Sequence, residues 1–101
     1  MIRGIIGYQV LNYKDVEPIF TQLRSHAMQY PGFVSAENLI SEGDQSVIIM
    51  ITTWEKMENW RTWAKSRKTK DLLRQLQQAK AVVIGAARLT AYRTLPPTEW
   101  S

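Results

Sequence analysis

The sequence contains no cysteine and only one histidine, His26, among its 101 residues. Without cysteine there is no disulfide framework, no thiol nucleophile and no zinc site built on sulfur, and a single histidine excludes a histidine-rich metal site. The lack of cysteine also fits a reducing compartment, and we expect a cytoplasmic protein. No run of 18 apolar residues and no signal-peptide pattern is present, so we expect neither a membrane span nor a membrane partner.

Internal repeats and low-complexity segments are also absent. A chain of 101 residues with 45% hydrophobic composition is long enough for one compact domain with one core. We assign that domain to residues 1–101, with a core over about residues 2–95. Pro96-Pro97 ends the core, and residues 96–101 form a C-terminal tail.

Positive charge is concentrated in one segment, although the chain carries a net charge of only +4. The basic residues of this segment are Arg61, Lys65, Arg67, Lys68, Lys70 and Arg74, and Asp71 is the acidic residue among them. Such a run is typical of the solvated face of a helix pair. It is also compatible with an anionic ligand or a nucleic acid.

The first third of the chain predicts a strand followed by a helix. Alternating apolar residues from Ile2 to Leu11 indicate a strand buried on both sides. Asp15 is a suitable cap for a helix whose first turn contains Pro18, and Pro31-Gly32 ends it. The apolar residues at helical spacing are Val16, Ile19, Phe20, Leu23, Ala27 and Tyr30.

The remainder predicts a hairpin, a helix broken in two and a final strand. The hairpin joins Phe33–Ser41 to Val47–Trp54 through a turn at residues 42–45. The apolar positions of the two helices are Met57, Trp60, Trp63 and Ala64, then Leu72, Leu73, Leu76 and Ala79, with a break at Lys65-Ser66-Arg67. Ala81 to Ala87 either opens a long strand or forms an apolar loop, and the strand from Ala87 to Leu95 is the clearer prediction.

The element order β-α-β-β-α-β predicts an α+β, ferredoxin-like split fold: a four-stranded antiparallel sheet with helices on one face. The third strand is apolar on both sides, with Ile48 and Met50 on one and Ile49 and Ile51 on the other. Exposed apolar surface on a small domain usually marks an interface, so we expect a homodimer. An RNA-recognition sheet needs exposed stacking aromatics that the third strand lacks, so we expect no nucleic-acid partner.

Three short motifs at characteristic spacing carry a family resemblance. They are Pro31-Gly32-Phe33, Thr53-Trp54-Glu55, and Trp60-x-x-Trp63 followed by Lys65-Ser66. Over residues 2–95 the sequence resembles the antibiotic-biosynthesis-monooxygenase (ABM) domain of the dimeric α/β-barrel superfamily. The resemblance implies a dimeric α/β barrel. Members of that family include cofactor-independent monooxygenases that oxidise polycyclic phenols or quinols with O₂, haem-degrading enzymes, and many proteins of unknown role.

The haem-degrading branch fits the sequence poorly. The resemblance places its axial histidine at Leu73 and its first-strand asparagine near Gly7. Leucine cannot bind iron, and His26 lies on a different predicted helix. We therefore expect no haem, no metal and no other cofactor.

The phenol-oxidising branch fits better and supplies the candidate site. The resemblance implies that Trp54 and Arg74 line the substrate site, while Trp60 and Asn38 stand where that branch has tyrosines. We expect the tryptophans to hold a small flat aromatic ligand, with Arg74 or Asn38 at a polar end. The candidate substrate-binding residues are thus Trp54, Trp60, Trp63 and Asn38.

The catalytic candidates are Arg74, His26 and Tyr8. A substrate that reacts with O₂ through its own phenolate supplies the electrons, so the protein must deprotonate it and shield the intermediate. Arg74 is the candidate for oxyanion stabilisation, and His26, Tyr8 or Tyr92 for proton acceptance.

Each candidate also has a purely structural interpretation. Trp60 and Trp63 could be core packing, His26 a surface or interface residue, and Arg74 a solvated helix charge. A non-catalytic dimer that binds or senses a small molecule through the same fold is therefore the alternative to an enzyme.

Overall fold

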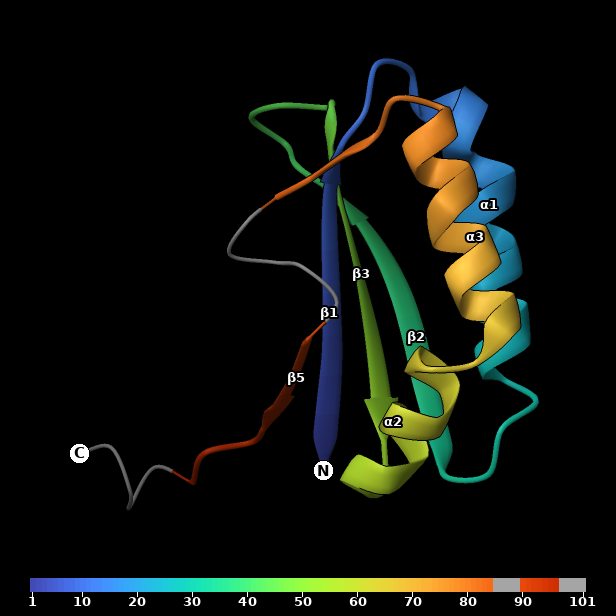
Figure 1. Cartoon of the computed structure of the whole chain (residues 1–101). Helices are drawn as coiled ribbons and strands as arrows, with labels where there is room; N and C mark the ends of the chain where they lie inside the picture. The colour runs from blue at the N-terminus through green and yellow to red at the C-terminus, as the bar shows by residue number, and fades with distance from the viewer. Residues whose placement is uncertain (85–89, 97–101) are drawn as a thin grey trace.

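The computed structural model describes residues 1–84 and 90–96 and shows a sheet with all of its helices on one face (Figure 1). The elements in chain order are β1 (Ile2–Gln9), α1 (Tyr13–Ala27), β2 (Phe33–Ile40), β3 (Val47–Trp54), α2 (Met57–Ala64), α3 (Arg67–Gln78), β4 (Val82–Val83) and β5 (Thr90–Arg93). No helix in the described ranges is long and apolar enough to cross a membrane.

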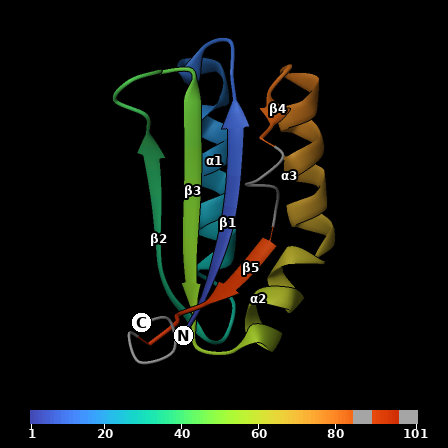
Figure 2. The same cartoon turned by 90° about the vertical axis from the view of Figure 1, so that its left-hand side faces the viewer.

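The sheet is antiparallel, with the strand order β2-β3-β1-β4, and β5 also pairs with β1. β4 lies opposite Tyr8 and Gln9, whereas β5 lies opposite Ile2 to Ile5. The two short strands thus share one edge, as Figure 2 shows, and together take the place of one fourth strand. This confirms the predicted ferredoxin-like fold, with β1 and β3 central. The sheet is open rather than closed into a barrel.

The chain between α3 and β5 was the ambiguous part of the sequence. Within the predicted segment Ala81 to Ala87, residues 82–83 form the strand β4, while residues 85–87 lie outside the described residues. Of the predicted strand Ala87 to Leu95, residues 90–93 are β5, and residues 87–89 again lie outside the description.

The core lies between the sheet and the helices. Every second residue of β3 is buried, because successive side chains of a strand point to opposite faces. Ile48, Met50 and Trp54 face the helices, while Ile49 and Ile51 remain partly exposed on the open face. The helices supply the buried side chains of Val16, Ile19, Phe20, Leu23, Ala27, Trp63, Ala64, Leu72 and Leu76.

The start of α1 differs from the prediction. The helix begins at Tyr13, and Asn12 is its cap: the Asn12 side chain accepts a hydrogen bond from the Lys14 backbone N–H at 3.1 Å. The predicted Asp15 cap is therefore wrong, and Pro18 lies inside the helix rather than in its first turn. The first strand is also shorter than predicted, since it ends at Gln9 and Leu11 is 79% exposed.

Candidate active site

The tryptophans pack in the core beside the α2 end of the sheet. Trp54 and Trp63 are fully buried with ring centroids 5.6 Å apart, and Phe33 meets Trp54 edge to face. The Trp54 Nε1–H donates to Thr52 Oγ1 at 2.9 Å. The Nε1 atoms of Trp60 and Trp63 are buried without a hydrogen-bond partner in the described part of the chain. These indoles thus fill space between the sheet and α2.

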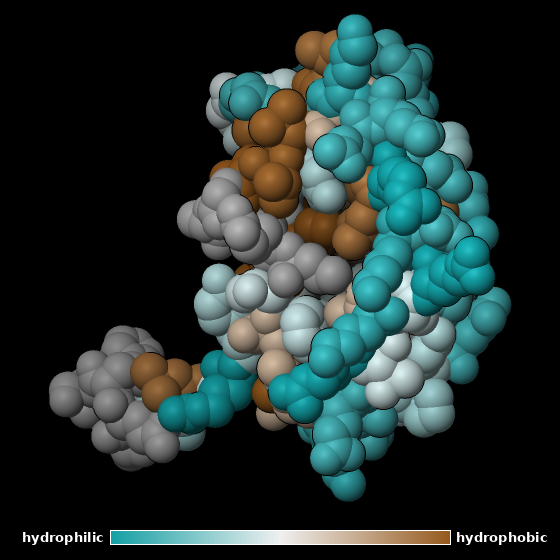
Figure 3. All heavy atoms as spheres, in the orientation of Figure 1, coloured by the Kyte–Doolittle hydropathy of each residue, from teal (hydrophilic) through white to brown (hydrophobic). Residues whose placement is uncertain are grey.

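A cavity lies between β1, β4 and α3. It has a volume of about 670 Å³. Its lining residues are Tyr8, Lys70, Leu73, Arg74, Gln77, Lys80, Ala81, Val82 and Val83. In Figure 3 the surface is hollowed between hydrophobic side chains near β4 and hydrophilic ones along α3. One side of this cavity is therefore apolar and the other is cationic.

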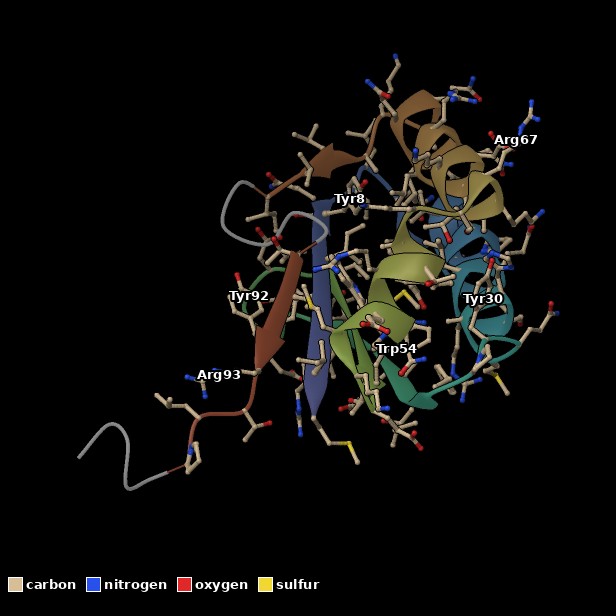
Figure 4. All side chains as sticks on the ribbon, turned by 60° about the horizontal axis from the view of Figure 1, so that its bottom comes forward. Tyr8, Tyr30, Trp54, Arg67, Tyr92 and Arg93 are labelled. Atoms are coloured by element: carbon tan, nitrogen blue, oxygen red, sulfur yellow. The ribbon has the colours of Figure 1, made fainter. Side chains whose placement is uncertain are left out.

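Tyr8 is the residue of β1 that faces this cavity. Its side chain is on the helix side of the sheet, 8% exposed, and its ring meets Phe20 edge to face at 6.2 Å. Figure 4 shows Tyr8 between the sheet and the helices, whereas Tyr92 lies on the opposite side of the sheet. Burial raises the pKa of Tyr8 above its usual value, because desolvation disfavours the phenolate. At neutral pH Tyr8 is thus a hydrogen-bond donor rather than a base.

Arg74 reaches the same cavity from α3. Its Nη1 lies 3.1 Å from Asp71 Oδ1, and the Arg74 side chain is 64% exposed. An exposed pair of this kind contributes only about 0 to 1 kcal/mol, so an anion in the cavity can compete with Asp71 for the guanidinium. Arg74 is therefore positioned to stabilise negative charge on a bound ligand.

His26 lies at a different place, on the outer side of the helices. Its Nε2 is 3.1 Å from Ser66 Oγ at the start of α3, and its ring meets Tyr30 edge to face at 5.0 Å. Burial and then the nearby charge of Lys68 lower the pKa of His26, so it is neutral at pH 7. The groove beside it, of about 310 Å³, is lined by residues of α1, by Gln29 and by Lys68, and it shares no residue with the Tyr8 cavity.

Asn38 is also separated from Tyr8. It is exposed on β2 and lines a small pocket of about 120 Å³ with Tyr13, Leu39, Ile40 and Ile48. Since β2 and β4 are at opposite edges of the sheet, the structure brings together Tyr8 and Arg74 but neither Asn38 nor His26 with them.

Sequence reasoning left out several residues of the cavity wall. Lys70, Arg74 and Gln77 recur at positions i, i+4 and i+7, which places them on one face of α3. The sequence contains this spacing, but a basic run by itself does not indicate that Lys70 faces a cavity. The contribution of Val82 and Val83 depends on the pairing of β4 with β1 and has no local signal.

Residues that could hold a metal or haem do not gather in the described part of the chain. Residues 1–84 and 90–96 contain no group of three His, Cys, Asp or Glu side chains arranged to bind a metal ion. Leu73 lies in the cavity wall at the position where the resemblance places an axial histidine, and leucine offers no lone pair to iron. This cavity therefore does not fit haem.

The sequence profile of the antibiotic biosynthesis monooxygenase family matches residues 12–75, from the cap of α1 to the third turn of α3. The chain belongs to this family. The match contains Arg74, whereas Tyr8, Lys80 and β4 lie outside it. No curated protein matches the sequence.

Several solved structures have a similar fold over nearly the whole chain. SnoaB, a cofactor-independent oxygenase from Streptomyces nogalater, is similar with a TM-score of 0.78 at 12% identity, over 94% of this chain and 93% of SnoaB. A proposed antibiotic biosynthesis monooxygenase from Deinococcus radiodurans has a TM-score of 0.82 at 9% identity, over 95% and 94%. A conserved protein from Methanosarcina mazei has a TM-score of 0.77 at 14% identity, over 93% and 92%. At these identities the likeness shows the fold alone.

Proposed function

We propose that this ABM protein is a cofactor-independent monooxygenase that oxidises a flat phenol- or quinol-type molecule with O₂. The observation that carries the proposal is the cavity of about 670 Å³, which combines Tyr8, an apolar β4 wall and the Arg74 guanidinium. Apolar walls with a few polar groups are typical of small-molecule sites. In this proposal the whole chain, residues 1–101, acts as one ABM domain in the cytoplasm.

The reaction needs no redox cofactor because the substrate supplies the electrons. For anthrone, a flat tricyclic ketone whose enol form is a phenol, the CH₂ group loses two hydrogens and gains one oxygen atom from O₂. The second oxygen atom leaves as water, so the substrate gives up the four electrons that O₂ accepts. The protein has to favour the phenolate, hold the ring and exclude water from the intermediate.

Arg74 and Tyr8 divide these tasks. The guanidinium of Arg74 stabilises the phenolate oxygen and the charge that develops on the oxygen adduct. The protonated Tyr8 donates a hydrogen bond to the ring oxygen, and the substrate proton passes to water. Trp54, Trp60 and Trp63 support the sheet and α2, while His26 acts through Ser66 by positioning α3.

Oxygen uptake with anthrone tests this function. The rate above autoxidation should fall about tenfold or more in Arg74→Ala, because removing a single oxyanion donor has large effects even where solvent weakens it. Arg67→Ala is the matched control, since Arg67 is an exposed arginine on the same helix that points away from the sheet (Figure 4). Equal rates in wild type, both variants and buffer would contradict the proposal.

A non-catalytic binding or sensing protein is the second candidate. Its supporting observation is that Tyr8, with its raised pKa, is a poor proton acceptor. Saturable binding of anthraquinone without oxygen uptake from anthrone would favour this candidate over the enzyme.

We also infer that the open face of the sheet binds a second copy of the chain. This face exposes part of Ile5, Ile49 and Ile51 from the two central strands, with Leu39 and Tyr92 at its sides. The partly exposed apolar residues of this face support the inference, because a monomer gains nothing from apolar residues that face water.

A further inference from the structure

Three cations line the proposed substrate cavity, which is more than oxidation of a neutral phenol requires. They are Lys70, Arg74 and Lys80, and no acidic residue is among the described residues of the wall. Arg74 is partly neutralised by Asp71, while neither lysine has an ion pair within residues 1–84 and 90–96. One cation suffices to stabilise a phenolate. The two lysines are then left without a role in that chemistry.

Lys80 is held in an unusual backbone conformation. It is the first residue beyond the cap of α3, and its φ of 63° is the positive-φ value of a non-glycine residue in the described chain. The Lys80 N–H bonds to the Gln77 carbonyl and the Ala81 N–H to the Leu76 carbonyl, both at 3.0 Å, which is the Schellman pattern. Glycine is the usual residue there because a side chain is strained at positive φ. A lysine at this position lowers the stability of the fold, so we expect its side chain to have another role.

The cavity lies along α3, so the partial charge at the C-terminal end of this helix also acts on a bound anion. The carbonyl end of a helix carries partial negative charge, which repels anions. Cations near that end stabilise the helix, but this stabilisation does not require a residue with a strained backbone such as Lys80. It also does not explain Lys70, which lies in the first half of α3. Lys70 and Lys80 both face the same cavity, from opposite ends of its α3 wall.

We propose that the aromatic ligand carries an anionic substituent, such as a carboxylate, and that Lys70 and Lys80 bind it at the rim of the cavity. This inference rests on the proposed function, since it places the ring of the ligand between Tyr8, β4 and Arg74. The substrate class becomes an aromatic phenol acid. Lys80 and Lys70 are then residues that determine specificity for the acid and take no part in the reaction at the ring.

A matched pair of ligands tests the proposal. Rhein is a dihydroxyanthraquinone with one carboxylate, and chrysazin is the same dihydroxyanthraquinone without it. Binding to the full-length protein, measured by fluorescence quenching at low salt, should be about tenfold tighter for rhein. The advantage should shrink as salt is raised, because the lysines are exposed and their charge is screened.

Variants separate recognition from structure. Lys80→Gly and Lys70→Gln should each weaken rhein binding about threefold to fivefold and leave chrysazin binding unchanged, as expected for an exposed ion pair. Lys80→Gly should also keep or raise the Tm, since glycine relieves the strain at positive φ. Lys68→Gln is the control, because it removes the same charge from α3 outside the cavity and should leave both affinities unchanged.

The possible outcomes distinguish the proposed anion site from the proposed phenol site on which it rests. Equal affinity for rhein and chrysazin, or equal weakening of both by Lys80→Gly, would overturn the anion site and leave the phenol site standing. Failure of both compounds to bind would overturn the anion site and the phenol site together. A fall in rhein affinity in Lys80→Gly, with unchanged chrysazin affinity and an unchanged or higher Tm, would support the proposal.

Discussion

At the scale of single residues, Gly4 leaves the space that the indole of Trp60 occupies. It lies on β1 opposite Thr52, on the side of the sheet that faces the helices. A Cβ built at Gly4 would lie against Trp60 Nε1, 2.6 Å from Trp60 Cδ1 and 2.8 Å from Thr52 Oγ1. The indole of Trp60 therefore occupies the space that a side chain at position 4 would need.

We expect Gly4→Ala to lower the free energy of unfolding by about 1 to 3 kcal/mol, because extra volume in a packed core forces side chains off their rotamers. Thr52 cannot yield easily, since its Oγ1 accepts the hydrogen bond from buried Trp54. The measurement is urea unfolding followed by tryptophan fluorescence. Gly43→Ala is the control: no atom lies within 4 Å of the Cβ there, and stability should change little. Equal stability of the two variants would contradict this packing.

The tryptophans also show where prediction from the sequence stops at this scale. Their spacing predicted that Trp60 and Trp63 lie on one face of a helix, which they do on α2. Whether an indole lines a cavity or fills the core depends on the residue across the sheet. The pairing of Gly4 with Thr52 spans 48 positions of sequence, and no local pattern reveals it. The left-handed backbone of Lys80 is equally invisible, because a lysine gives no signal of positive φ.

At the scale of elements, the break between α2 and α3 is held by one side chain. Ser66 caps α3: its Oγ accepts a hydrogen bond from the Thr69 N–H at 3.2 Å and donates one to Thr69 Oγ1 at 2.9 Å. His26 of α1 reaches the same oxygen at 3.1 Å. The start of α3 is thus tied to α1, and α3 carries the cationic wall of the cavity.

Ser66→Ala should destabilise the fold by about 1 to 3 kcal/mol. It removes a helix cap and leaves the fully buried Thr69 hydroxyl without its partner. Thermal unfolding by circular dichroism measures the change. Ser25→Ala on α1 is the control, since Ser25 is exposed and alanine favours helix there. The explanation fails if the two variants have the same Tm.

The elements themselves were largely predictable, and the exceptions have a physical cause. Apolar residues at helical and alternating spacing located the β2–β3 hairpin and the start of α3 within one or two residues, whereas α1 begins and ends about three residues earlier than predicted. The cap of α1 was misplaced because Asn12 and Asp15 are both good caps, and only the backbone shows which one precedes the first helical residue. β4 and β5 are too short for a periodicity to specify them, and they depend on pairing with β1.

At the scale of the whole molecule, the layered structure leaves one sheet face without helices. Figure 2 looks onto this face, with β3 and β1 at its centre. Charged and polar residues such as Arg3, Gln9 and Glu37 lie around its apolar centre, which is the arrangement of a specific interface. Because the cavity lies on the helix side, a partner on the open face would leave it accessible.

We therefore expect a homodimer of about twice 11.7 kDa in sedimentation equilibrium at micromolar concentration. A stable interface buries at least about 1,000 Å² in total, and an extended apolar sheet face on each copy can supply that area. Ile49→Lys, at the centre of the face, should shift the protein to monomer, because it buries an unpaired charge in the interface. Met28→Lys adds the same charge to an exposed apolar residue on the helix side and should remain dimeric. A wild-type protein that sediments as a monomer would contradict the dimer. A Met28→Lys variant that dissociates as Ile49→Lys does would mean that the contact is not specific to the open face.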